Sequence, residues 1–356
     1  MYKALISPLT GKKLMSKYFK WLDLGFIRVI LLVLVPIVAF LFSFAIGRYG
    51  IPVSQLLSTL YVHYFGSSTA QASNLDTVVF NIRLPRIIAG MLVGAALSTA
   101  GAAYQGMFKN PLVSPDILGA SAGAGFGACL AIFLSQSVYV IQISAFVFGL
   151  IAVLLACLIN KHLDYDPTLG LVLGGILIST LFSSGTGAIK YFADANDKLP
   201  EITFWLMGSL SSVDKRDIAS IIIPMLIGFI PLFIVRWRIN VLAFGEEEAR
   251  TLGINTRRLR FIVIISSTVI TAASVSICGM VGWIGLVVPH LARSIVGPNY
   301  RTLLPVTGIL GATYLLLVDD IARCLGSVEV PLGILTALLG VPFFIIIFEN
   351  NVRGWK

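Results

Sequence analysis

Few side chains in this sequence have the type and spacing that would support chemistry. It contains no GxxxxGKS/T segment and no HExxH segment, so it predicts neither a phosphate-binding loop for ATP nor a zinc-peptidase site. Its three histidines, His63, His162 and His290, are isolated, and its four cysteines form no CxxC pair. We therefore expect no catalytic residues, no metal site, no disulfide and no cofactor bound by this chain.

An adjacent pair of carboxylates, Asp319 and Asp320, ends the apolar run at 315–318. Ionisable groups inside apolar segments are functional candidates because they are costly to bury. This pair would be the only ion-coupling group for a self-sufficient secondary transporter. Arg323 follows at the i, i+4 spacing of a helical ion pair with Asp319, which is the simpler interpretation. The secondary transporter remains an alternative, whereas an intramembrane enzyme would need a catalytic cluster that the sequence does not show.

The composition indicates that most of the surface faces lipid. Hydrophobic residues make up 57% of the 356 residues and charged residues only 12%, with a mean hydropathy of +0.92. Soluble domains carry roughly 25% charged residues, so this chain lacks the polar groups to cover a water-facing surface. The formal net charge is +9, and the cations fall mainly between apolar runs. That distribution follows the positive-inside rule and argues against nucleic-acid binding.

About ten apolar runs are long enough, or nearly so, to cross a bilayer, which takes ~17–25 residues. They begin near Leu24, Leu84, Ile117, Val138, Leu169, Ile218, Phe261, Val287, Leu304 and Leu332. The run at 281–296 contains Pro289 and His290, so it predicts a broken helix packed against protein, with the histidine as a hydrogen-bonded packing group. A signal peptide is the alternative interpretation of the first run, but this run, 24–46, is longer than the apolar region of a signal peptide. Glycines four residues apart predict closely packed helices. The predicted fold class is an all-α polytopic membrane protein.

Hydrophilic connections between these runs set the expected topology. Five lysines precede the first run, which places the N-terminus in the cytoplasm. Threading ten spans then puts the loops at 49–81 and 190–217 outside and the most charged loop, 236–260, inside. The expected organisation is a basic cytoplasmic extension at 1–23, a transmembrane domain at 24–350 and a cytoplasmic tail at 351–356. Both termini would be cytoplasmic in a multi-pass protein of the cell (inner) membrane.

The inside loop predicts a short amphipathic helix. Residues 242–254 place three carboxylates, Glu246, Glu247 and Glu248, in a first turn, where the helix dipole favours negative charge. Gly253 is positioned to end the helix. Leucine, alanine and phenylalanine side chains on one side would suit docking to a partner. By composition alone, a solvated linker helix is an equally good interpretation.

Several of these segments resemble a known family. They are RLPR at 83–86, NPL at 110–112, LGASAGA at 118–124, the loop at 242–253, GWIGLVVPH at 282–290 and EVPLG at 329–333. Together they resemble the membrane permease subunits of type II ABC importers, the FecCD-like permeases for iron-siderophores, haem and vitamin B12. The resemblance runs from about residue 80 to the C-terminus.

The resemblance implies a fold of ten helices per subunit. Two subunits, a homodimer or a pair of close paralogues, would join about a two-fold axis that coincides with the pathway. An ABC ATPase subunit dimer would bind ATP and magnesium in the cytoplasm. A periplasmic or lipid-anchored substrate-binding protein would deliver the substrate. The chain would be a transport subunit without an ATPase site of its own, in contact with membrane lipid.

The resemblance also implies roles for particular residues. A coupling loop to the ATPase would comprise Leu242, Gly245, Glu246, Ala249, Arg250, Leu252 and Gly253. A cytoplasmic gate would comprise Asn110, Leu112, Thr168 and Leu169. Docking to carboxylates of the binding protein would use Arg83, Arg86 and Arg323. For Arg83 and Arg86, the two arginines of RLPR, binding to membrane headgroups is the alternative interpretation.

The fifth span carries hydroxyl groups and no fixed charge at Ser179, Thr180, Ser183, Ser184 and Thr186. Such a lining would hold a polar chelate weakly, which suits a pathway whose affinity resides in a partner. A ferric siderophore is the first expectation for the substrate. Haem, cobalamin and an oxyanion such as molybdate follow, and the absence of a cationic cluster in the predicted spans argues against a tight oxyanion site.

Overall fold

The computed structural model describes residues 30–47, 50–52, 54–56, 58–59, 61, 74–162, 167–242, 244–326 and 328–353. Every regular element in these ranges is a helix. The expected extension at 1–23 and the last residues of the expected tail lie outside the described residues. The helices are Ile30–Ala45, α3 (Asn74–Thr77), η1 (Val78–Arg83), α4 (Leu84–Met107), η2 (Pro115–Leu118), α5 (Ala120–Phe133), α6 (Val138–His162), α7 (Pro167–Phe192), α8 (Lys198–Met207), α9 (Lys215–Leu242), α10 (Glu246–Thr251), α11 (Thr256–Cys278), α12 (Ile284–Val296), α13 (Tyr300–Cys324) and α14 (Leu332–Arg353).

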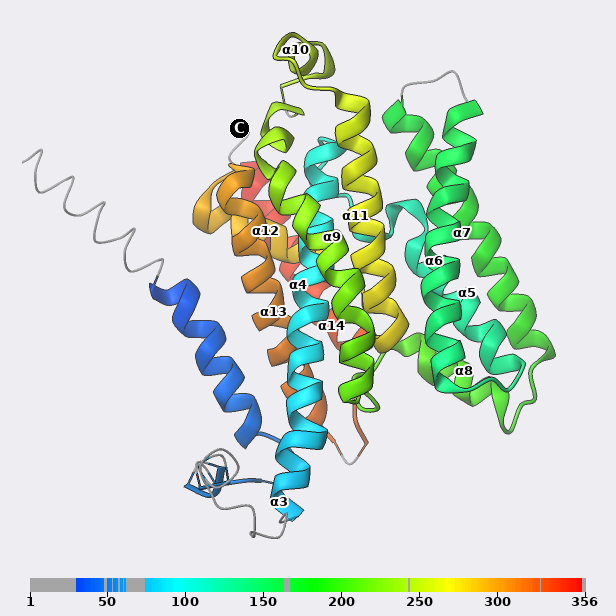
Figure 1. The fold of residues 1–356 in the computed structure, drawn as a ribbon, viewed down its shortest axis with the longest axis vertical. Coiled ribbons are helices and arrows are strands. Elements are labelled where there is room, and N and C mark those ends of the chain that lie inside the picture. The colour runs from blue at the N-terminus through cyan, green and yellow to red at the C-terminus, as the bar shows by residue number, and fades with distance from the viewer. Residues whose placement is uncertain are drawn as a thin grey trace, which may run out of the picture.

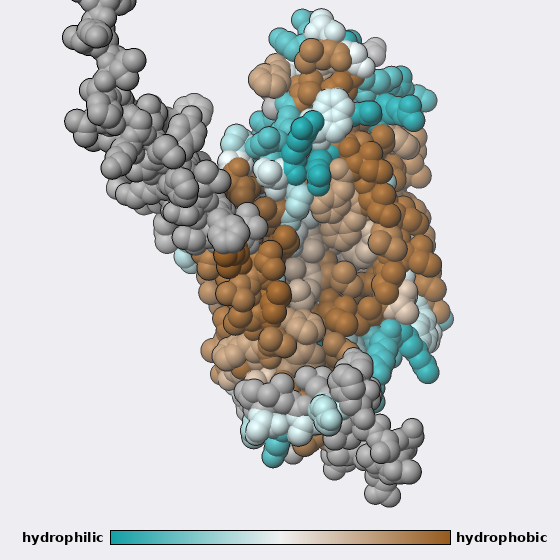
Figure 2. Space-filling model, turned by 60° about the vertical axis from the view of Figure 1, so that its left-hand side comes forward, coloured by the Kyte–Doolittle hydropathy of each residue, from teal (hydrophilic) through white to brown (hydrophobic). Residues whose placement is uncertain are grey.

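Ten of these helices correspond one for one to the ten predicted apolar runs. Among the described residues, six helices are long and apolar enough to cross a membrane, and four shorter apolar helices accompany them. The surface agrees with this division, since a hydrophobic band separates two hydrophilic ends (Figure 2). The all-α polytopic membrane fold is therefore confirmed.

The second span begins earlier than predicted. The loop expected at 49–81 ends at Asn74, where α3 starts and runs through η1 into α4 as one continuous apolar helix, Leu75–Met107, of 33 residues. The segment η1 is π-helical and ends just before Pro85, which lies in the first turn of α4 and donates no backbone hydrogen bond to η1. The sequence did not indicate this extension, because polar residues interrupt the apolar pattern before Leu84.

The amphipathic stretch in the second outside loop forms α8 as expected.

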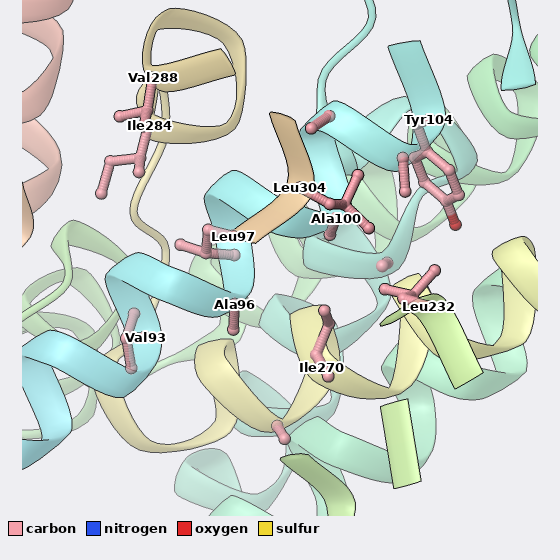
Figure 3. Packing of buried hydrophobic residues seen from close by; sticks show 14 of the residues in the cluster. Val93, Ala96, Leu97, Ala100, Tyr104, Leu232, Ile270, Ile284, Val288 and Leu304 are labelled. Carbon is pink, nitrogen blue, oxygen red and sulfur yellow. The ribbon is translucent and has the colours of Figure 1, made fainter. Parts of the chain in front are cut away.

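Helix α4 is the centre of the fold, with α9, α11, α12 and α13 around it (Figure 1). In its most apolar stretch, 78% of the residues are buried. The side chains that pack there come from five different helices, as the close view shows: Val93, Ala96, Leu97, Ala100, Tyr104, Leu232, Ile270, Ile284, Val288 and Leu304 (Figure 3). A lipid-embedded bundle holds together by such close packing, because burial from lipid supplies little hydrophobic driving force.

Small residues allow the closest approaches. A Cβ atom at Gly94 would lie 2.2 Å from the carbonyl oxygen of Gly311 on α13, and one at Gly101 would lie 1.9 Å from that of Gly285 on α12. Helices α5 and α6 also approach closely, since a Cβ at Gly123 of α5 would lie 2.4 Å from the carbonyl oxygen of Phe148 on α6. The close packing predicted from the glycine spacing is confirmed.

The span predicted at 281–296 is short, as expected, but it is not broken at Pro289: α12 continues through that proline, and the interruption lies before Ile284. Helix α11 ends at Cys278, and α12 begins only at Ile284. Between them the backbone turns through positive φ at Gly279 (68°) and Trp283 (68°), and positive φ is uncommon for a residue with a side chain. The Nε2 atom of His290 lies 3.0 Å from the carbonyl oxygen of Pro111, which gives the histidine the packing role expected of it.

Candidate functional site

The charged loop at one end of the bundle contains the predicted short helix. Helix α9 ends at Leu242, and α10 lies at the tip of the molecule, at the end opposite α3 and α8 (Figure 1). Two glycines with positive φ bound α10, Gly245 at 137° and Gly253 at 77°. Gly253 ends the helix as predicted, because a left-handed residue after the last turn stops propagation and glycine adopts it without strain.

The apolar residues of this loop divide into two sets. Leu242 and Ala249 are buried against the membrane domain, with 1% and 0% exposed. Phe244 and Leu252 are 75% and 67% exposed at the hydrophilic tip of the molecule, and Arg250 is exposed beside them. Two large apolar side chains that face water on either side of a short helix form a surface suited to a protein partner. Their role in coupling stays a prediction.

The four residues of the predicted gate are held by two separate sets of contacts. The side-chain oxygen of Asn110 accepts a hydrogen bond from the backbone N–H of Leu112 at 2.9 Å. Thr168 accepts one from Arg260 Nη2 at 3.1 Å. Leu112 is 51% exposed and Leu169 is 48% exposed. Closure of a mouth by all four residues, together with those of a second subunit, stays a prediction.

Helix α7 presents an exposed stripe that changes character along its length. The first half is apolar, with Leu173 and Ile176 exposed. In the second half Thr180, Ser183 and Ser184 are exposed, while Ser179 and Thr186 are half-buried. The Thr180 hydroxyl donates to the carbonyl of Ile176 at 2.9 Å, and Thr186 donates to that of Phe182 at 3.0 Å. All five hydroxyl residues thus lie on the helix where predicted, and their lining of a pathway stays a prediction.

The three arginines expected to face an outside partner are instead buried. Arg83, Arg86 and Arg323 are 5%, 7% and 5% exposed. Arg86 Nη2 lies 2.8 Å from Asp319 Oδ1 and 2.8 Å from Glu329 Oε2. A guanidinium held by two carboxylates of its own chain is not presented for docking, so the expectation of exposed docking arginines is corrected.

The same network includes the predicted ion pair within α13. Arg323 Nε lies 3.2 Å from Asp319 Oδ2, which confirms the i, i+4 pairing. Arg323 also pairs with Asp320 and donates to the Ser43 hydroxyl at 2.7 Å, and Arg83 donates to the carbonyl of Phe44. The cluster therefore ties the helix Ile30–Ala45 to α4 and α13. Charges that are out of water require close partners, which is the physical reason why these arginines and carboxylates lie against one another.

This arrangement bears on the secondary-transporter alternative. Asp319 has no exposed side-chain surface and lies within 3.2 Å of two guanidinium groups, those of Arg86 and Arg323. A carboxylate that couples transport to an ion must exchange that ion with water. Asp319 is therefore placed as a structural ion-pair partner.

Two acidic residues with structural roles were missed from the sequence. Glu329 lay within a recognised segment but received no role, because its partner Arg86 is 243 positions away. Asp116 of η2 accepts a hydrogen bond from Ser121, and burial raises the pKa of its carboxyl group above the usual range.

Comparison with known proteins agrees with this architecture. A model of the FecCD transport family matches residues 32–349. The molybdate import system permease protein MolB of Haemophilus influenzae is 39% identical over 91% of this chain and 95% of that protein. A probable iron chelatin transport system permease protein of Helicobacter pylori is 42% identical over 77% of this chain and 83% of its own length.

A solved structure supports the same assignment. It is described as an inward-facing conformation of a metal-chelate type ABC transporter, and it superimposes with a TM-score of 0.80 at 38% identity, covering 90% of this chain and 97% of that one. The family match covers most of the chain, and the relatives that share it are transport components without an ATPase site of their own. The chain therefore belongs to the FecCD transport family and is a polytopic permease subunit of an ABC importer.

Proposed function

We propose that this permease moves a metal chelate across the inner membrane, with a ferric siderophore as the leading substrate. The observation that carries the proposal is the exposed hydroxyl stripe at Thr180, Ser183 and Ser184 on α7, which bears no charged group. Hydroxyl groups can exchange hydrogen bonds with the many oxygen atoms of a chelate without holding it tightly. A weak lining favours release, while affinity resides in the binding protein.

An oxyanion such as molybdate is the second candidate, because a relative named for molybdate import aligns over most of the chain. A site that holds a small dianion needs cationic groups or several converging N–H donors. The hydroxyl stripe of α7 carries no cationic group between Thr180 and Ser184, and Arg86 and Arg323 are engaged by carboxylates. This favours the chelate.

The assembly would follow from the same proposal. Two permease subunits would pair so that their α7 stripes face each other across the pathway. Residues 242–253 would dock to an ATPase dimer through Phe244 and Leu252, and both termini would lie in the cytoplasm. The gate residues Asn110, Leu112, Thr168 and Leu169 would narrow the cytoplasmic mouth. A substrate-binding protein would dock at the α3 and α8 end through surface groups other than the three buried arginines.

Uptake by the reconstituted transporter tests the substrate. Vesicles containing the permease with its ATPase and binding protein are supplied with labelled ferric siderophore, haem, cobalamin and molybdate. ATP-dependent uptake of the ferric chelate is expected. Ser184→Leu should lower that uptake, whereas Leu226→Ile, at an exposed position on α9, should leave it unchanged. Uptake of molybdate with none of the chelates would overturn the substrate assignment while leaving the permease assignment intact.

A further inference from the structure

A pocket of about 290 Å³ lies between the last turns of α9 and the first turn of α11, at the α10 end of the molecule. Its walls include an aromatic ring, two guanidinium groups and apolar side chains, from Trp237, Arg238, Leu252, Asn255, Arg258 and Leu259. None of these residues belongs to the hydroxyl stripe, the gate or the arginine cluster. Leu252 and Gly253, which also line the pocket, are shared with the loop that is proposed to meet the ATPase.

The pocket is positively charged. Arg238 and Arg258 are both exposed, and among the described residues neither lies within ion-pair distance of a carboxylate. The guanidinium carbon of Arg238 lies 5.5 Å from the ring centre of Trp237. The first turn of α11, capped by Asn255 through the N–H of Arg258 at 2.9 Å, adds the positive end of a helix dipole. The site therefore attracts an anion.

The depth of the pocket matches the headgroup layer of a membrane. Arg216 near the start of α9 and Arg238 near its end are 22 residues apart, which is about 33 Å of α-helix at 1.5 Å per residue. The hydrocarbon core of a bilayer is ~30 Å thick. A tryptophan and an arginine at this boundary are in the position that interfacial anchors occupy.

An apolar stripe leads from the pocket into the membrane. Ile223, Ile227, Ile230 and Ile234 are 66%, 57%, 53% and 66% exposed on α9. Their spacing of three or four residues places them on one face of the helix, and Trp237 continues that face at the pocket. An acyl chain that followed this stripe would bring its phosphate to the two arginines.

We propose that this pocket binds the phosphodiester headgroup of an anionic phospholipid from the leaflet on the α10 side, with its acyl chains along the isoleucine stripe of α9. The guanidinium groups of Arg238 and Arg258 hold the phosphate, and Trp237 covers the glycerol region. That leaflet is cytoplasmic in the proposed orientation, but the binding site itself does not depend on the substrate. Because Leu252 forms one wall, a bound headgroup also supports the base of the α10 loop.

Lipid retention by the permease purified with its ATPase tests this site. Native mass spectrometry would compare phosphatidylglycerol with phosphatidylcholine of the same acyl chains, for the unchanged protein and for Arg238→Gln and Arg258→Gln. An arginine near an anionic lipid surface contributes about fivefold in affinity, so each variant should lose about fivefold of phosphatidylglycerol retention and the double variant about 25-fold. Phosphatidylcholine retention should change little.

The matched control is Arg257→Gln. Arg257 is exposed and adjacent in sequence to Arg258, but it does not line the pocket. Retention within twofold of the unchanged protein is expected for this variant. An equal loss in Arg257→Gln would show a general attraction of the basic loop and would overturn the site, as would equal retention of the two lipids by the unchanged protein.

Two further measurements show whether a lipid, a free phosphate or the ATPase occupies the pocket. Excess inorganic phosphate should not displace the lipid, because it lacks the chains that follow the stripe, and full displacement would overturn a lipid as the ligand. Loss of the bound lipid whenever the ATPase is present would assign the pocket to the protein interface instead. Thermal unfolding in lipid-free detergent should be the same for all three single variants, and Arg238→Lys should recover part of the retention because it restores the charge.

Discussion

Asp319 is the carboxylate on which two buried arginines depend, and its replacement by asparagine should strongly destabilise the membrane domain. Its side chain is fully buried, 2.8 Å from Arg86 and 3.2 Å from Arg323. Removal of one partner of a buried ion pair leaves an uncompensated charge and typically costs about 3–5 kcal/mol. Asp319→Asn should lose stability in that range, because Glu329 neutralises only part of the remaining positive charge.

The free energy of unfolding would be measured by titrating the purified permease in mixed micelles with a denaturing detergent. Glu329→Gln is the matched control: it removes the other carboxylate of Arg86, but its side chain is 28% exposed, so water can replace much of the lost interaction. Its effect should be about 1 kcal/mol or less. A double variant, Arg86→Gln with Asp319→Asn, should be less destabilised than the sum of the single variants, since the two groups interact directly.

The reasoning would be refuted if Asp319→Asn unfolded with the same free energy as the unchanged protein. That result would mean that water reaches the two guanidinium groups and stabilises them without the carboxylate. Equal losses for Asp319→Asn and Glu329→Gln would also contradict the argument, because it ranks the two carboxylates by burial.

Three other predictions follow from the packing and the exposed surfaces. Leu252→Asp places a charge on the exposed apolar tip of the α10 loop and should abolish ATP-driven transport while the permease still folds; normal transport would remove the docking role of this loop. Cysteines introduced at the exposed positions Leu112 and Leu169 should form crosslinks between subunits, and the crosslinking yield should change when ATP and a transition-state mimic are added. A yield that does not respond to nucleotide would contradict the assignment of these residues to the gate. Gly101→Ala forces a Cβ against the Gly285 carbonyl and should destabilise the fold by about 1–3 kcal/mol. Gly187→Ala, whose Cβ would meet nothing within 4 Å, should leave the stability unchanged, and thermal unfolding of both variants in detergent tests this difference.

Much of the architecture was available from the sequence because the bilayer imposes one-dimensional constraints. The length and polarity of the apolar runs predicted the ten apolar helices among the described residues, but not that α12 would continue through Pro289. Local chemistry gave the α10 helix and its end at Gly253. The start of the second span was misplaced, because Asn74–Arg83 carries polar residues whose burial depends on neighbouring helices.

Long-range partners account for what the sequence could not show. The pairing of Asp319 with Arg323 was predicted because the two lie one turn apart on one helix. The pairing of Arg86 with Asp319 and Glu329 joins residues more than 230 positions apart, so no local pattern in the sequence predicted it. The resemblance suggested exposed arginines, and only the packing of α4 against α13 showed that they are buried.

Length, hydropathy and helix-ending glycines are properties of short segments, so the sequence by itself determined that this chain spans the membrane many times and carries a short helix outside it. Which charges meet, and which side chains remain exposed to a partner, depend on how helices pack. The tertiary structure therefore decided that Arg83, Arg86 and Arg323 lie inside, and that Phe244, Leu252, Arg238 and Arg258 remain outside. The physical reason is that burial of a charge requires a partner at a few ångströms, and only the folded chain brings distant partners that close.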